Sequence, residues 1–165
     1  MNLYSTNPED LLFNAARMGD VEYLKQAIEK GLDLNLQDAR GFSPLILACY
    51  EEHKYVAELL LDNGADIDLQ DAAGNTALMG VAFKGYKEIA EMLILKGADV
   101  NKQNFSGATA LMFSVMFGRH DLVKVLLENK SDISIKDSRG FTVVDIANQI
   151  GNEQALEMLQ VDTME

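Results

Sequence analysis

The apolar residues of this chain recur with helical spacing in three stretches that lie 33 residues apart. Each stretch places apolar residues at positions i, i+3 and i+4, with charged residues between them. This pattern predicts a helix that buries one face. A shorter apolar segment with small residues precedes each of these helices, so two helices are expected in each period. The buried positions are expected at Val56, Leu59, Leu60, Ile89, Met92, Leu93, Leu122, Val125 and Leu126.

A polar motif connects one pair of helices to the next. Residues 71–79, "DAAGNTALM", and residues 104–112, "NFSGATALM", carry nearly the same letters. An Asp or Asn followed three residues later by Gly is typical of a turn, because glycine adopts positive φ without strain. Each period is therefore expected to form a turn, two helices and a loop, with turns that open at Asp38, Asp71, Asn104 and Asp137.

The ends of the expected helices carry capping residues. A hydroxyl residue stands two positions after each turn glycine, where its side chain is placed to accept a hydrogen bond from the first amides of a helix. Glycines that suit a left-handed cap end most of the helices, whereas Glu52 and Lys130 occupy two of these places. The expected N-caps are Asn7, Ser43, Thr76, Thr109 and Thr142, with Pro8 and Pro44 opening their helices, and the expected terminating glycines are Gly64, Gly85, Gly97, Gly118 and Gly151.

The D-x-x-G-x-T-x-L opening, the glycine between the helices and the L-L-x-x-G-A-D-V-N ending resemble the ankyrin repeat, whose period is also 33. The resemblance runs from about Asn7 to Leu159. It implies an all-α solenoid of stacked helix-turn-helix units with β-turn fingers, forming a single domain over residues 1–165. The units are expected at about 5–37, 38–70, 71–103, 104–136 and 137–165, with the first and the last as polar caps of the stack.

The chain departs from the family at the position where histidine usually follows the "TPL" letters. The residues at that position here are Ile46, Met79, Met112 and Asp145. The resemblance therefore implies that the hydrogen bond of that histidine to the neighbouring unit is missing. Packing is expected to stabilise the contact between units at this position instead.

Composition and charge narrow the expected partners and location. With 14 Lys and Arg against 26 Asp and Glu, the formal net charge is −12, and an acidic surface repels nucleic acid and anionic membranes. Apolar runs stay far below the roughly twenty residues of a membrane helix. The chain shows no leader segment, and Cys49 is the single cysteine. A soluble cytoplasmic protein is expected, with neither nucleic acid nor a membrane as its partner.

The residues that carry chemistry in other proteins are few and scattered in this chain. His53 and His120 lie 67 residues apart, whereas a metal or catalytic site needs several converging groups. Cys49 precedes His53 by four residues, but it occupies the small-residue place of Ala82 and Val115 and is expected in the core. No phosphate-binding glycine motif is present. We therefore expect no catalytic, metal-binding or cofactor-binding residues.

The resemblance implies a binding surface, because ankyrin repeats hold partners on a concave face made by finger tips and the exposed ends of first helices. Aromatic and basic residues occupy several of these places, and contiguous exposed apolar residues mark interaction sites. The alternative is that neighbouring tips and helices cover the rings, which then belong to an outer part of the core. The candidate binding residues are Arg40, Phe42, Tyr50, Phe83, Lys84, Phe105, Met116, Phe117 and Arg139.

Three functions from different classes remain open at this stage. The favoured function is a non-enzymatic, monomeric module that binds a partner protein through its concave face. A narrower alternative is an inhibitor or immunity-type protein that sequesters a toxin or an enzyme, which fits a small acidic array. An enzyme with an unrecognised site is least favoured, because the ionisable residues do not cluster.

Overall fold

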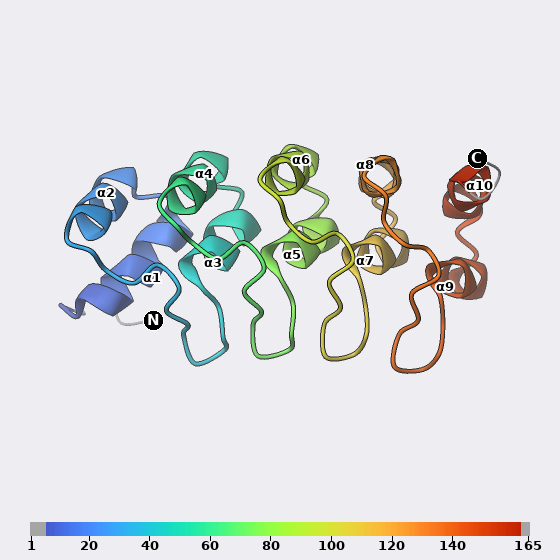
Figure 1. Ribbon diagram of the computed structural model, residues 1–165, viewed down its shortest axis with the longest axis horizontal. Helices are drawn as coiled ribbons and strands as arrows, with labels where there is room; N and C mark the ends of the chain where they lie inside the picture. The colour runs from blue at the N-terminus through green and yellow to red at the C-terminus, as the bar shows by residue number, and fades with distance from the viewer. Residues whose placement is uncertain (1–5, 163–165) are drawn as a thin grey trace.

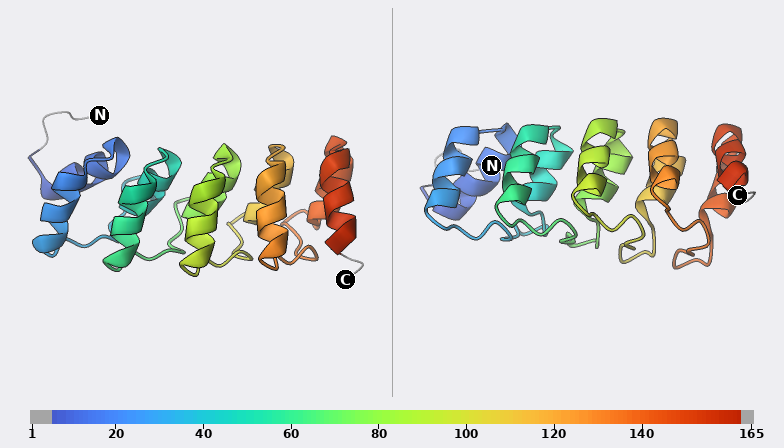
Figure 2. Two further views of the ribbon diagram at one scale, coloured as in Figure 1. Left: turned by 90° about the horizontal axis from the view of Figure 1, so that it is seen from above. Right: turned by 45° about the horizontal axis from the view of Figure 1, so that its top comes forward.

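The structure, a computed structural model that describes residues 6–162, is a row of stacked helix pairs (Figure 1). Ten helices and no strand occur within that range. The first helices of the units form one row, and the second helices form another row beside it (Figure 2). The all-α solenoid predicted from the sequence is therefore confirmed. The first helices are α1 (Pro8–Met18), α3 (Pro44–Tyr50), α5 (Ala77–Lys84), α7 (Ala110–Met116) and α9 (Val143–Ile150), and the second helices are α2 (Val21–Glu29), α4 (Lys54–Asp62), α6 (Lys87–Leu95), α8 (His120–Glu128) and α10 (Glu153–Asp162).

Each first helix begins at the capping residue that the sequence predicts. The Asn7 side chain accepts a hydrogen bond from the amide of Glu9 at 3.1 Å, and Pro8 opens α1. The Thr76 hydroxyl accepts from the amide of Met79 at 3.3 Å. These side chains satisfy backbone donors that have no partner within the helix. Ser43, Thr109 and Thr142 cap α3, α7 and α9 in the same way.

A continuous apolar core runs along the stack between the two rows of helices. Leu45, Leu78 and Leu111, which lie one period apart, are all buried in it. Ala48 and Ala82 are fully buried between neighbouring first helices, where their small side chains permit close packing. The apolar periodicity of the sequence is therefore satisfied by contacts between consecutive units.

The positions that carry histidine elsewhere in the family are filled by apolar packing in the inner units. Ile46, Met79 and Met112 are buried in the core. Asp145 is exposed, and its carboxylate accepts hydrogen bonds from the amide and the hydroxyl of Thr142 at 2.8 and 2.7 Å. The predicted replacement of a hydrogen bond by packing is confirmed at the inner positions.

Packing is nevertheless supplemented by a ladder of glutamine side chains that the sequence analysis did not predict. The turns that open at Asp38, Asp71, Asn104 and Asp137 are called fingers below. The Gln70 side-chain amide donates to the carbonyl of Gly74 in the finger that follows it at 2.6 Å, and to the carbonyl of Gln103, one period further along the chain, at 3.0 Å. One side chain therefore shapes its own turn and joins it to the next. Gln37 and Gln103 make the equivalent pairs of bonds, to Gly41 and Gln70 and to Gly107 and Lys136.

The finger backbones also bond directly to one another. The amide of Phe105 donates to the carbonyl of Ala73 at 3.1 Å, and the amide of Ser138 donates to the carbonyl of Ser106 at 2.9 Å. This approach leaves no room for a side chain at the turn glycine, since a Cβ on Gly74 would lie 2.6 Å from the Phe105 nitrogen. The turn glycine is therefore needed both for its positive φ and for contact with the next unit.

Among residues 6–162, two residues other than glycine adopt the left-handed backbone conformation. Glu52 has φ 66° between α3 and α4, and Lys130 has φ 63° after α8. These are the two places where the sequence departs from the expected glycine, and Gly64 and Gly97 hold the equivalent conformation to that of Lys130 in the preceding units. A side chain at positive φ is sterically strained.

Alanine at Gly74 should destabilise the protein more than alanine at Gly140. Both glycines have positive φ, 81° and 86°, so both replacements introduce the same backbone strain. A Cβ at Gly140 meets no atom within 4 Å, and we expect Gly140→Ala to cost about 1 kcal/mol. Gly74→Ala should cost about 2–4 kcal/mol, because the next finger must move as well. Urea denaturation of both variants measures the difference, and equal losses would contradict the close approach of the fingers.

Glycine at Lys130 should stabilise the protein by about 0.5–1 kcal/mol, because it removes a side chain from a left-handed residue. The midpoint of urea unfolding is the measurement. Lys130→Ala is the matched control, since it removes the long side chain and its charge but leaves a Cβ at φ 63°. A gain that is the same for both variants would show that the strain is not the cause.

Candidate functional site

Three aromatic rings follow one another across consecutive units at the ends of the first helices. Tyr50 ends α3, Phe83 lies in the last turn of α5, and Phe117 caps α7. The rings of Tyr50 and Phe83 lie 6.4 Å apart and are nearly parallel, and those of Phe83 and Phe117 lie 4.6 Å apart and edge to face. Both arrangements are favourable for aromatic pairs. Tyr50 and Phe83 lie one period apart, and Phe117 lies 34 residues after Phe83, next to Met116, which is the equivalent residue of the fourth unit. The ends of the three helices thus bring the rings into one row, called the aromatic row below.

The aromatic row is shielded on one side and open on the other. Tyr50 is 39% exposed and Phe117 is 41% exposed, while Phe83 between them is half-buried. The ring of Phe42, in contrast, packs against the hydrophobic core. Both alternatives in the sequence analysis are thus partly realised, since neighbouring rings cover one another while the two outer rings of the row keep an exposed face.

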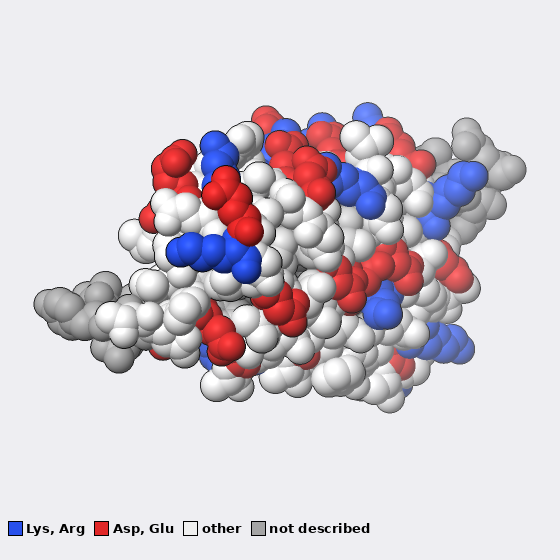
Figure 3. Space-filling view, turned by 60° about the vertical axis from the view of Figure 1, so that its left-hand side comes forward, with Lys and Arg blue, Asp and Glu red and all other residues white. Residues whose placement is uncertain are grey.

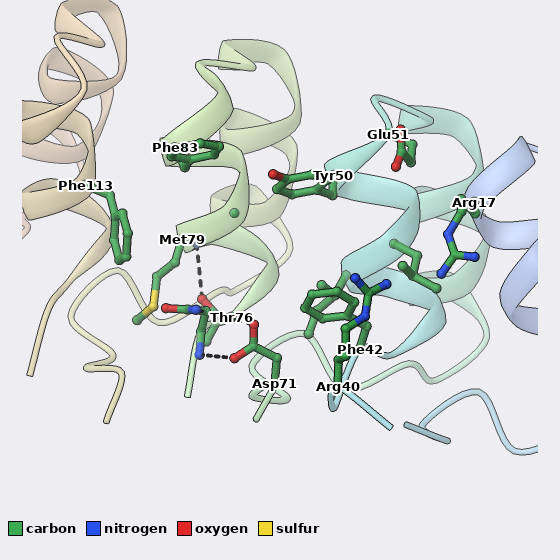
Figure 4. Close-up of a pocket in the computed structure, with 14 residues that line it drawn as sticks. Arg17, Arg40, Phe42, Tyr50, Glu51, Asp71, Thr76, Met79, Phe83 and Phe113 are labelled. Carbon is green, nitrogen blue, oxygen red and sulfur yellow. Dashed lines mark hydrogen bonds between the residues drawn. The ribbon is translucent and has the colours of Figure 1, made fainter. Parts of the chain in front are cut away.

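A cavity of about 300 Å³ opens between the second and third units beneath the aromatic row (Figure 4). Tyr50 and Phe83 form one side, and Ile46 and Met79 contribute apolar side chains from the first turns of α3 and α5. Phe42 lines the finger side of the cavity, where Arg40 lies over its ring (Figure 4). The cavity is therefore mainly apolar, with a cationic group at its edge.

Glycine in the middle of α5 explains why this cavity exists. Gly80 lies one period after Leu47 and one period before Phe113, and all three residues line the cavity. A Cβ on Gly80 would lie 3.5 Å from the Tyr50 ring carbon Cδ2. The equivalent residue of the last unit is Ile146. Large side chains thus occupy this row on both sides, and the third unit leaves a gap between them.

Basic side chains lie over the aromatic rings of this face. The Lys84 nitrogen lies 4.5 Å from the centre of the Tyr50 ring, and the Arg40 guanidinium lies 4.6 Å from that of Phe42. These distances are favourable for a cation above an aromatic ring. The rings therefore hold the cations close to the cavity and the aromatic row.

Arg40 and Arg139 occupy equivalent finger positions but differ in their electrostatic environment. Arg139 lies over Phe141 at 5.1 Å and also forms an ion pair with Asp137 at 2.7 Å. Burial raises the pKa of Asp137, but hydrogen bonds from the side chain of Arg139 and from the amides of Phe141 and Arg139 outweigh it and hold that pKa below its ordinary value. The charge of Arg139 is thus neutralised locally, whereas Arg40 makes no ion pair within the described residues.

The structure brings together most of the nine residues proposed from the sequence. Arg40, Phe42, Tyr50 and Phe83 line the cavity. Lys84 and Phe117 contact the rings of Tyr50 and Phe83. The remaining three lie outside the cavity: Phe105 is 72% exposed on its finger, Met116 is 43% exposed beside Phe117, and Arg139 belongs to the last unit.

Sequence reasoning missed Arg17 and Gly80 as lining residues of the cavity. The signal for Gly80 was present as the one small residue in the row of Leu47, Phe113 and Ile146. Arg17 ends on the same side because α1 packs against α3. That contact could be inferred only after the stacking of the helices was known.

A family model described as ankyrin repeats (3 copies) matches residues 1–71 and 78–163. The chain belongs to the ankyrin-repeat family. Ankyrin repeats are generally protein–protein interaction modules. No match to a curated protein was found.

The two histidines of this ankyrin-repeat chain join neighbouring units. His53 Nε2 lies 3.0 Å from the carbonyl oxygen of Arg17 at the end of α1, and His120 Nε2 lies 2.9 Å from Asn152 Oδ1. Arg119, two periods after His53, likewise donates to the carbonyl of Phe83 at 3.1 Å. These contacts account for the polar residues at the junctions between paired helices. Within residues 6–162, no group of three or more His, Cys, Asp or Glu is placed to hold a metal ion.

The outer face, formed by the second helices of the ankyrin stack, carries paired charges. Lys87 and Glu91 lie 3.7 Å apart on α6, and Lys96 reaches Asp62 of the preceding unit at 2.6 Å. In Figure 3, acidic and basic side chains are interspersed over the surface seen from the N-terminal side. No helix among the described residues is long and apolar enough to cross a bilayer.

Cys49 is expected to resist thiol reagents in the folded ankyrin stack. Its side chain is fully buried, and burial raises the pKa of its thiol to about 12. Because the thiolate is the reactive form, labelling with a disulfide reagent at pH 8 should proceed only as fast as the protein opens. Labelling in urea above the unfolding midpoint is the control and should be rapid. Immediate labelling of the folded protein would show that the thiol is accessible.

Proposed function

We propose that this chain is a non-enzymatic, monomeric protein-binding module, and that the aromatic row with its neighbouring cations is the surface that receives the partner. The carrying observation is the alignment of Tyr50, Phe83 and Phe117 across three units, with two of the rings about two-fifths exposed. Aromatic residues and arginine are enriched at protein interfaces. The family of the chain supports a protein as the partner.

Several observations favour binding over catalysis. The histidines are engaged between units, and the Cys49 thiol is buried with a raised pKa. A catalytic site needs a nucleophile or base that substrate can reach. The net charge of −12 disfavours nucleic acid. The free thiol of Cys49 fits a reducing compartment such as the cytoplasm.

Removal of a central ring should weaken binding while leaving the fold intact. We expect Phe83→Ala and Phe117→Ala each to weaken binding by about 2 kcal/mol, as the loss of an anchor residue at the centre of an interface does. Arg40→Ala should also weaken binding. The partner is first isolated by affinity capture with the full chain from extracts of the source organism, and its affinity for each variant is then measured by titration calorimetry.

The outer face supplies the matched controls. Lys87→Ala and Glu91→Ala break an exposed ion pair and should change stability and binding by no more than about 0.5 kcal/mol. Thermal melts of all variants separate folding from binding. Early unfolding of the two phenylalanine variants would assign the rings to the core. Normal binding by these variants, with weak binding by the outer-face variants, would place the partner on the second helices.

A further inference from the structure

We propose that the cavity between the second and third units binds one large apolar side chain of an extended partner segment, and that Arg40 binds a carboxylate next to that side chain. This proposal rests on the proposed function, because it specifies the chemistry of the partner at the same face. The partner is then a protein segment in which Leu, Met or an aromatic residue adjoins Asp or Glu. The cavity, its glycine and the free cation each contribute to this inference.

The size and lining of the cavity favour a single side chain. Its volume of about 300 Å³ lies at the lower limit of small-molecule sites, which run from about 300 to 1,000 Å³. Ile46, Met79 and Phe83 surround it with apolar atoms. Burial of one large apolar side chain at such a place removes both surfaces from water.

Gly80 indicates that the cavity is retained against a structural cost. Glycine inside a helix is unfavourable, because the unfolded chain loses more backbone freedom there than with any other residue. The equivalent positions on either side carry Leu47 and Phe113, so the repeat accepts large residues at this place. A position that tolerates bulk in neighbouring units but carries glycine in this one keeps space for something outside the chain.

The distribution of charge favours an acidic neighbour for the inserted side chain. The chain has four arginines: Arg17 lies in the last turn of α1, Arg40 and Arg139 lie on fingers, and Arg119 is the N-cap of α8. Lysines of the outer face, in contrast, pair with carboxylates of their own helix row. A guanidinium held over a ring, as that of Arg40 is over Phe42, is restrained in position and so is prepared for a carboxylate.

Two carboxylates of the chain also line the cavity, and their positions identify Arg40 as the binding cation. Glu51 lies on the same side as Arg17 (Figure 4), so that side carries both signs of charge. Asp71 lies on the finger side, where one of its oxygens accepts from the amides of Ala73 and Asn75 at 2.8 Å. Its carboxylate is therefore used within the turn, and the Arg40 guanidinium has no carboxylate within ion-pair distance among the described residues.

A random peptide library displayed on phage, selected against the folded full chain, tests this inference. We expect the enriched peptides to share a large apolar residue next to Asp or Glu. The affinity of one enriched peptide, made synthetically with a fluorescent label, is then measured by anisotropy. Gly80→Leu, which fills the cavity, should weaken it by about tenfold or more, as loss of a hydrophobic pocket does. Gly80→Ala should cause a smaller loss, and neither should lower the melting temperature, because both residues favour helix over glycine.

Arg40→Gln and Arg139→Gln form a matched pair for the charge. Both arginines lie over a phenylalanine of their finger, but in the part of the chain that the structure describes only Arg139 has an ion-pair partner. We expect Arg40→Gln to lower the affinity for the peptide by about fivefold or more, and Arg139→Gln to lower it by less than about twofold. Replacement of the acidic residue of the peptide by its amide should cause a loss similar to that of Arg40→Gln, and the two losses together should not add.

Any of the following outcomes would overturn the inference. Peptides without a shared apolar–acidic pair, unchanged affinity for Gly80→Leu, equal losses at Arg40 and Arg139, or no enrichment at all would contradict it. The proposed function fails by a different result, because it requires only that the partner protein be sensitive to Phe83→Ala and Phe117→Ala. A partner that loses affinity for those two variants but binds Gly80→Leu normally would keep the proposed function and reject the cavity as its anchor point.

Discussion

The direct contact between neighbouring finger backbones joins the second to fifth units at a close and repeated distance. At the contact between the third and fourth units, the Phe105 amide bonds to the Ala73 carbonyl, and Gly74 leaves room for that approach. The Gln70 side chain joins the same two turns. The same bond recurs at equivalent residues between the fingers of the second to fifth units, so these helix pairs follow one another with a similar translation. Helix packing, the alignment of side chains and the shape of the inner face all follow from it.

Because the units follow one another with a similar translation, residues that are one period apart in the sequence become neighbours in space. Residues 33 positions apart, such as Tyr50 and Phe83, become neighbours, and a side chain that differs between units stands beside its own counterpart. The pair of Tyr50 and Phe83 arises in this way, and so does the gap at Gly80 between Leu47 and Phe113, whereas Phe117 stands one position beyond the counterpart of Phe83. The aromatic row and the cavity therefore depend on differences between copies of one motif, supported by the residues that the copies share.

Most of the fold could be predicted because local signals and stacking agree. The side chains of Asn7 and Thr76 cap their helices, as expected from residue types that accept hydrogen bonds from the first amides of a helix. Lys130 adopts the left-handed conformation that glycine holds at the same position in other units. The candidate site was predicted only in part. Which rings cover one another depends on distances between units, and the pairing of Arg139 with Asp137, absent at Arg40, depends on side-chain orientation that the shared motif does not specify. The glutamines of the ladder do recur at the 33-residue period, but the period does not show that one side chain bonds to two neighbouring turns.

The separation between shared and variable residues has a consequence for how partner choice can evolve. The backbone bonds between fingers involve no side chain from the positions of Leu47, Gly80, Phe113 and Ile146. A substitution that exchanges large and small residues within this row would move the vacancy from one unit to another while leaving the fingers joined. Under the proposed function, single changes in this row can therefore alter what the protein binds while the backbone bonds between the fingers stay in place.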